Sequence, residues 1–187
     1  MNLYKLYSKP QELEAFHTVK NFDPDFAYDH LRNNDPNDQS AIQCILKKSP
    51  WNCFKYAAYV LKQRWPQGEH KIAELAISSY DYAKTVLKGS FKLGEPILAK
   101  DGYYAAAYAL NVTGKRFIEA EQAIKELAYL YIDEGDYEDE NGHFNDGAHE
   151  DALSDVQMAC DYKMRFGLAD EWDNEWAEEH EMDWMDD

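Results

Sequence analysis

One 14-residue motif occurs three times in this chain, as Tyr56-Ala-Ala-Tyr-Val-Leu-Lys-Gln-Arg-Trp-Pro-Gln-Gly-Glu69, Tyr82-Ala-Lys-Thr-Val-Leu-Lys-Gly-Ser-Phe-Lys-Leu-Gly-Glu95 and Tyr108-Ala-Leu-Asn-Val-Thr-Gly-Lys-Arg-Phe-Ile-Glu-Ala-Glu121. The copies are 26 residues apart, and each keeps its Tyr, Ala, Val, an aromatic residue and a final Glu. An apolar position keeps the same step at Leu46, Ile72, Leu98 and Ile124. A fixed step of this length indicates repeated units that bury their apolar faces against one another.

Each copy is predicted to form a longer helix, a tight turn and a short helix. Tyr82, Ala83 and Val86 lie at positions i, i+1 and i+4, which share one face of a helix. No segment sustains the alternation of a strand. The expected boundaries are N-caps at Ser49 and Asp101, helix starts at Gly68-Glu69 and Gly94-Glu95-Pro96, and C-terminal glycines at Gly89 and Gly114. The sequence therefore predicts an all-α fold, a short solenoid-like stack of helix pairs with helical caps at both ends.

Three regions follow from this pattern. Residues 1–48 are expected to form an N-terminal helical cap, interrupted by a loop at the Asn/Asp/Pro-rich stretch Asn33–Gln39. Residues 49–132 contain the three-copy repeat body, and residues 133–187 form an acidic, tryptophan-rich helical segment.

The motif Y-A-x-x-V-(I/L)-K-(G/Q)-x-(F/W)-x-x-G-E resembles a tandem repeat of poorly characterised bacteriophage and bacterial proteins. The resemblance covers residues 46–125, and it implies a helical, solenoid-like body and a phage context. The third copy departs from the pattern, because Gly114-Lys115 is displaced and Ala120 replaces the glycine. The resemblance carries no catalytic residue over to this chain.

Charge is divided unevenly along the chain, whose net charge is −17. Residues 133–187 hold 21 acidic and two basic side chains, a net of −19, while the other residues hold 15 acidic and 17 basic ones, a net of +2. This balance argues against nucleic acid or an anionic membrane as a partner and favours a basic protein surface, a bound cation or simple solubility. Three cysteines without a CxxC pair, together with the lack of a signal-like start, lead us to expect a cytoplasmic protein without a cofactor.

The acidic segment carries two helical patterns. Leu153, Val156, Cys160 and Met164 form an apolar stripe that ends at Gly167, and Asp170 is a candidate cap for a last helix. In one alternative the tryptophans of that helix pack on the end of the stack and its acids are solvated; in a second the acidic and aromatic surface docks on a basic partner; in a third the segment is a disordered acidic tail. The partner-binding residues expected in the second case are Trp172, Asp173, Glu175, Trp176, Glu178, Glu179, Asp183 and Trp184.

Other candidate sites carry weaker patterns. The stretch from Asp133 to Gly142 fails as an EF-hand, because the loop positions that must supply oxygen ligands fall on Tyr137 and Ala148. The His143–Glu150 loop leaves open a metal-dependent enzyme or metal-binding protein. The repeated Glu69, Glu95 and Glu121 are interpreted as helix-start carboxylates. The repeated basic positions are interpreted as surface charge with some internal pairing; the alternatives are a ridge that receives the acidic C-terminus of the chain or a small anion-binding stripe. These positions are Lys62, Arg64, Lys88, Lys115 and Arg116.

The function expected from these patterns is that of a non-enzymatic binding protein. A phage-encoded inhibitor or adaptor that occludes a host defence or DNA-handling protein fits the acidic, motif-poor sequence, and DNA mimicry is its narrower form. A structural, self-associating module remains the third alternative, beside the metal-dependent one.

Overall fold

The computed structural model describes the backbone of residues 23–130 and 146–181, and the side chains of residues 23–130 and 150–176. Helices and short loops make up this part of the chain, in which no strand occurs, so the predicted all-α class is confirmed. The elements are α2 (Pro24–Asn33), α3 (Gln39–Lys48), α4 (Pro50–Lys55), η2 (Tyr56–Leu61), α5 (Glu69–Ile72), α6 (Ala76–Asp81), η3 (Tyr82–Leu87), α7 (Glu95–Leu98), α8 (Gly102–Tyr108), η4 (Ala109–Thr113), η5 (Ile118–Ala120), α9 (Glu121–Ala128), α10 (Asp146–Arg165) and α11 (Ala169–Glu181).

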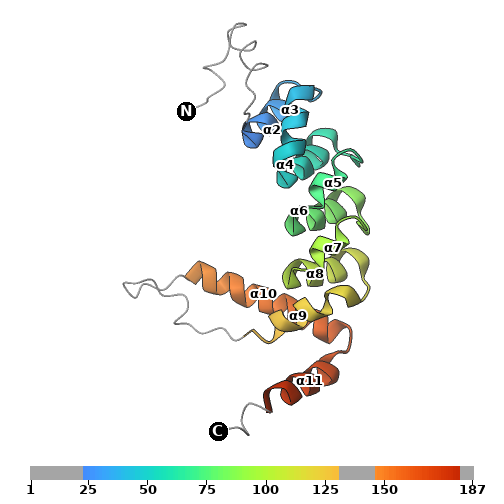
Figure 1. Ribbon diagram of the computed structural model, residues 1–187, viewed down its shortest axis with the longest axis vertical. Coiled ribbons are helices and arrows are strands. Elements are labelled where there is room, and N and C mark those ends of the chain that lie inside the picture. Colours follow the sequence, from blue (N-terminus) through green and yellow to red (C-terminus); the bar gives the residue numbers. More distant parts are fainter. Residues whose placement is uncertain (1–22, 131–145, 182–187) are drawn as a thin grey trace, which may run out of the picture.

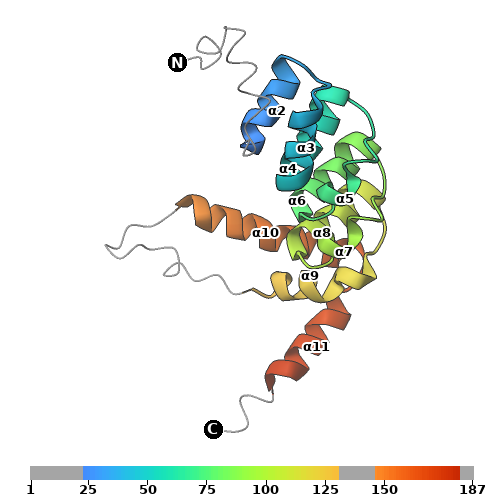
Figure 2. The ribbon, with the colours of Figure 1, turned by 45° about the horizontal axis from the view of Figure 1, so that its top comes forward.

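The repeat units stack into a curved body (Figures 1 and 2). The long helices contact one another in chain order, α4 with α6 and α6 with α8, and they line the concave side. The short helices α5 and α7 lie with the loops on the convex side. The α2–α3 pair begins the stack, and α10 packs on α8 and α9 at its other end.

Local capping follows the sequence. The Ser49 hydroxyl accepts a hydrogen bond from the N–H of Asn52 at 3.1 Å, and the Asp101 carboxylate accepts one from the N–H of Tyr104 at 3.1 Å. The short helices α5 and α7 begin at the two predicted glutamates. These predicted boundaries are confirmed.

The ends of the long helices differ from the prediction in one copy. Each long helix widens into a π-type turn, η2, η3 or η4, and stops at a residue in the left-handed region. That residue is Gly114 in the third copy, as predicted, with φ 63°. In the first two copies it is Lys62 (φ 54°) and Lys88 (φ 52°), and Gly89 is the residue after it. The prediction for Gly89 is wrong because the turn keeps the same motif position in all three copies, and there the second copy carries a lysine.

The 26-residue step also orders the core. Ile72, Leu98 and Ile124 are all fully buried, and each is the fourth residue of the helix that begins at the repeated glutamate. Upstream, the step predicts Leu46, but Leu46 is only partly buried and its neighbour Ile45 is fully buried. The N-terminal pair therefore closes the stack without continuing the repeat in register.

The predicted apolar stripe of α10 is wrong at its two ends. Leu153 is 47% exposed and Met164 is 70% exposed, whereas Ala159 and Tyr162 are fully buried. The reason is the position of the helix: its C-terminal half lies against α8 and α9, while its N-terminal half projects from the concave side of the stack (Figure 1). Among the described helices, none combines the length and the apolar character that a bilayer-spanning helix needs.

Candidate partner-binding grooves

A buried tyrosine joins each repeat to the preceding one. The Tyr82 hydroxyl accepts a hydrogen bond from the backbone N–H of Trp65 at 2.9 Å and donates one to the Glu69 carboxylate at 3.1 Å. Tyr82 belongs to the second copy, and its two partners belong to the first. Burial raises the pKa of Tyr82 to about 12, so the hydroxyl keeps the proton that it donates.

The same arrangement recurs at the next two junctions. Tyr108 accepts from the N–H of Phe91 at 2.8 Å and donates to Glu95 at 3.0 Å. At the third junction Tyr162 of α10 accepts from the N–H of Phe117 at 2.9 Å and donates to Glu121 at 2.9 Å. Helix α10 therefore supplies the tyrosine of an incomplete fourth repeat.

The repeated glutamates begin helices, as the sequence indicated, and they also hold a cation on the convex side. Arg64 pairs with Glu69 at 2.7 Å, and this hydrogen bond is the main cause of the lowered pKa of Glu69. Lys92 pairs with Glu95 at 2.9 Å, and Arg116 donates two hydrogen bonds to Glu121. Some of the internal pairing expected for the basic positions is thus present.

Two grooves lie beside these tyrosines, one at each junction between complete copies. The first has a volume of about 450 Å³ and the second about 530 Å³. Every residue that lines the first groove has its counterpart, 26 positions later, in the lining of the second. In the following pairs the first residue lines the first groove and the second residue lines the second groove: Arg64 with Ser90, Glu69 with Glu95, Ser90 with Arg116, Phe91 with Phe117, Lys92 with Ile118, and Leu93 with Glu119. The grooves are therefore a property of the repeat.

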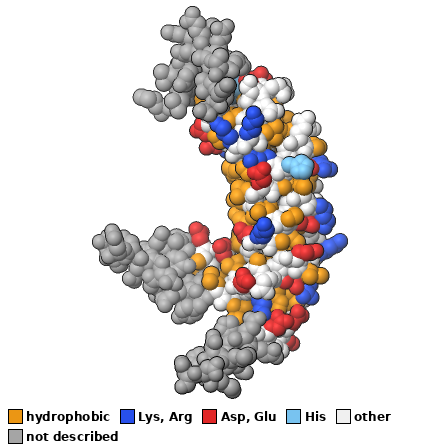
Figure 3. Space-filling model, in the orientation of Figure 1, with side chains coloured by type: hydrophobic (Ala, Val, Ile, Leu, Met, Phe, Trp, Pro, Cys, Tyr) orange, Lys and Arg blue, Asp and Glu red, His pale blue; other side chains and the backbone are white. Residues whose placement is uncertain are grey.

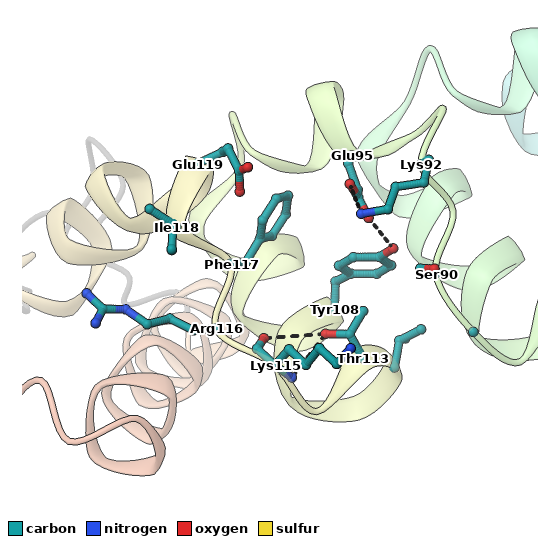
Figure 4. Close-up of a pocket in the computed structure, with 12 residues that line it drawn as sticks. Ser90, Lys92, Glu95, Tyr108, Thr113, Lys115, Arg116, Phe117, Ile118 and Glu119 are labelled. Carbon is teal, nitrogen blue, oxygen red and sulfur yellow. Dashed lines mark hydrogen bonds and ion pairs between the residues drawn. The ribbon is translucent and has the colours of Figure 1, made fainter.

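The second groove combines cations with an apolar rim (Figure 4). Lys92, Lys115 and Arg116 line it, together with the carboxylates of Glu95 and Glu119. The Ile118 side chain on its rim is 69% exposed. Large apolar side chains at such exposure, next to charges, are typical of surfaces that contact another molecule.

Three lysines near the grooves have no partner inside the described part of the chain. The ammonium groups of Lys62, Lys88 and Lys115 form no ion pair with a described residue, and all three side chains are exposed. Two of these lysines hold the left-handed turns, where a side chain other than glycine costs free energy. In the view of Figure 3, Lys and Arg side chains gather along the convex edge.

The C-terminal helix α11 is docked on the end of the stack. Trp172 is 3% exposed, and its ring stacks on Tyr162 with centroids 6.1 Å apart. This side chain is therefore packed within the chain, as the first alternative for the tryptophans expects, and its contact with a partner stays a prediction. Trp176 stacks on Tyr129 at 5.6 Å and remains 39% exposed.

Two acidic residues of α11 form close ion pairs, one with α10 and one with the repeat body. Asp173 pairs with Lys163 at 2.8 Å, and this contact is the main cause of its lowered pKa. Glu175 pairs with Lys125 at 3.1 Å. Both side chains remain about half exposed, which leaves part of each carboxylate open to solvent.

Helix α11 also contacts the second groove. The Glu171 carboxylate lies 3.8 Å from Arg116, which also lines the second groove. Asp170 lies in the first turn of α11, which begins at Ala169, so the prediction that Asp170 caps this helix is wrong.

Several predicted positions fall outside what the structure describes. Glu178 and Glu179 lie in α11, but their side chains are outside the described set, and Asp183 and Trp184 lie beyond the described residues. Of the His143–Glu150 loop, residues 146–150 belong to α10, and only the side chain of Glu150, which is exposed, is described. The described residues contain no group of three or more His, Cys, Asp and Glu side chains able to hold a metal ion.

The cysteines have the character of core residues. Cys53 is fully buried, and burial raises the pKa of its thiol to about 12, so it is a thiol at neutral pH. Its Sγ donates to the carbonyl of Ile45 at 3.3 Å.

Sequence reasoning found only part of the groove lining. It singled out Arg64, Lys115 and Arg116 as repeated charges, but it missed the apolar rim at Leu93 and Ile118. The 26-residue step pairs Leu93 with Glu119 and Lys92 with Ile118, so neither apolar residue recurs in type and the motif alone gave no signal.

The chain matches no family model, no curated protein and no solved structure. Its function is therefore inferred from its own residues.

Proposed function

We propose that this protein is a non-enzymatic binding protein, an inhibitor or adaptor that covers a surface of a partner protein through its convex row of grooves. The observation that carries the proposal is the repetition of the groove lining at the 26-residue step. A row of equivalent sites suits a long partner surface better than one isolated small molecule.

The buried network makes this surface rigid before binding. Each junction tyrosine is fixed by two hydrogen bonds, one of them to a charged carboxylate, so the loops that form the grooves are held in place. A preformed surface loses less conformational entropy when it binds.

The charge of the body supports an acidic partner segment. Residues 49–132 contain 11 basic and eight acidic side chains, a net of +3, although the whole chain is strongly acidic. This partner chemistry is the reverse of the basic surface that the acidic C-terminus suggested. Three described carboxylates of α11, those of Glu171, Asp173 and Glu175, support the change, because they are paired within the chain. The DNA-mimic form of the proposal depends on residues outside the described set.

Site-specific photo-crosslinking tests the proposal. Ser90 is exposed and lines both grooves, so a photoreactive residue at this position reports what enters them. We expect a discrete crosslinked protein in cells that carry this chain, and its loss when Lys92→Ala and Lys115→Ala are combined.

The matched control places the same photoreactive residue at Thr85, an exposed residue that lines neither groove. Identical products from both positions, or a product that survives the double substitution, would show that the grooves are not the binding surface.

A further inference from the structure

The docking of α11 shows which chemistry this stack accepts. Two carboxylates one helical turn apart, Glu171 and Glu175, each face a cation of the body, Arg116 at 3.8 Å and Lys125 at 3.1 Å. Aromatic rings between and beside them stack on tyrosines. The third junction is thus closed by an acidic, tryptophan-bearing helix.

The first two junctions offer related features without such a cover in the described chain. The second groove presents Lys92 and Lys115 beside Arg116, and Lys92 is 81% exposed even though it pairs with Glu95. Ile118 on the same rim is an apolar surface for a ring to cover. The first groove also holds cations and an apolar side chain, at other positions of the repeat: Arg64 and Lys92 line it together with Leu93, which is 40% exposed.

We propose that the two grooves bind an acidic helical segment of a partner protein, with aromatic side chains on the face that carries its carboxylates, in the way that α11 closes the third junction. This inference rests on the proposed function and names the chemistry of the partner.

Charge and shape together select this occupant. The convex cations attract carboxylates at short range, where pairing is strong, and the exposed Leu93 and Ile118 favour a segment that also carries rings. A nucleic acid supplies phosphates but has no apolar side chains that could pack on Leu93 and Ile118. The net charge of −17 also repels a long polyanion at a distance.

The test uses a synthetic peptide with the sequence of residues 167–181, labelled with a fluorophore and titrated with the full-length protein. Fluorescence anisotropy is expected to show saturable binding. Lys92→Ala combined with Lys115→Ala is expected to weaken it at least tenfold, about 1.4 kcal/mol. A peptide in which the positions of Glu171 and Glu175 are lysine is expected not to bind.

Two protein controls separate the grooves from general charge and from α11 itself. Lys47→Ala combined with Lys100→Ala removes the same charge from exposed positions outside the grooves and is expected to change the affinity less than twofold. Lys125→Ala removes the ion pair between Lys125 and Glu175 of α11 and is expected to leave peptide binding unchanged. A loss of affinity in Lys125→Ala without a loss in the groove variant means that the peptide displaces α11, and this overturns the inference.

Failure of the proposed occupant can be distinguished from failure of the proposed function. If the peptide does not bind, or if duplex DNA displaces it, while the Ser90 crosslink remains dependent on Lys92 and Lys115, the occupant is wrong and the binding function stands. If the crosslink also fails, both are wrong.

Discussion

At the scale of single residues, the tyrosine hydroxyl is the group that makes one repeat depend on the next. Tyr108 uses its hydroxyl as acceptor and donor at the same time, so no other side chain of similar size can replace it. Alignment of the copies shows that the tyrosine recurs, but it does not show that its partners lie in the preceding copy. The sequence therefore predicted the position of Tyr108 and left its role unassigned.

Tyr108→Phe is expected to destabilise the protein by about 1–3 kcal/mol, because the buried N–H of Phe91 loses its acceptor and Glu95 loses a donor. Urea unfolding followed by circular dichroism measures the change. Tyr103→Phe is the control, since Tyr103 is partly exposed and its hydroxyl has no hydrogen bond within the described residues. Equal losses in both variants would contradict the bridging role.

The buried tyrosines also predict how stability depends on alkaline pH. Burial raises the pKa of Tyr82 to about 12, and it raises those of Tyr108 and Tyr162 as well, from an ordinary value of 10.0. Above pH 10 the unfolded chain releases these protons while the folded chain keeps them, so stability falls as pH rises from about 10 to 12. Urea midpoints between pH 8 and 11.5 test this, and a Tyr82→Phe variant should show a shallower decline than the wild type.

At the scale of elements, the turn between the long and short helices depends on how closely the aromatic ring approaches the backbone. A Cβ added at Gly94 would lie 2.5 Å from the Phe91 ring. The third copy has Ala120 at this position, and there the distance between the ring centroids of Tyr108 and Phe117 is 5.7 Å, against 5.1 Å for the Tyr82 and Phe91 rings of the second copy. The third copy departs from the motif at this position, and the larger separation of its rings accompanies the methyl group of Ala120.

Gly94→Ala is expected to cost about 1–3 kcal/mol, because the new methyl group overlaps the Phe91 ring and the Ser79 side chain. Thermal unfolding provides the measurement. Gly89→Ala is the matched control, because a Cβ there meets nothing closer than 3.9 Å. If Gly89→Ala proved the more damaging substitution, the packing explanation for the repeated glycine would be wrong.

The two C-terminal elements show where sequence reasoning reaches its limit. The step places a fourth tyrosine at position 134, which is Glu134, whereas the structure uses Tyr162. The residues between them break the spacing, so the motif could not identify α10 as part of the stack. The helical spacing of the tryptophans predicted the helix, but periodicity alone could not decide which ring faces inward.

Trp172→Ala is expected to destabilise the protein by about 3–5 kcal/mol, since it empties a buried site against Tyr162. Trp176→Ala is expected to cost clearly less, because its ring is 39% exposed and covers only one face of Tyr129. Limited proteolysis near Gly167, together with unfolding curves, distinguishes the two. Equal, small effects would mean that α11 is not docked on the stack in solution.

At the scale of the whole molecule there are two candidate binding surfaces, the grooves of the basic body and the acidic C-terminal segment. The last six residues, Met182–Asp187, carry three of the acidic side chains and a tryptophan, and their removal takes the net charge from −17 to −14. If the grooves are the binding surface, a chain that ends at Glu181 keeps the Ser90 crosslink to its partner at full yield. Less negative charge also weakens the long-range repulsion of an acidic segment, so the association rate of the peptide should rise modestly, by up to about twofold at low salt. Stopped-flow anisotropy at two ionic strengths measures that rate, and the gain should vanish at high salt, where the charges are screened. Loss of the crosslink on truncation, with the groove lysines intact, would instead assign binding to the acidic terminus and return the partner to a protein with a basic surface.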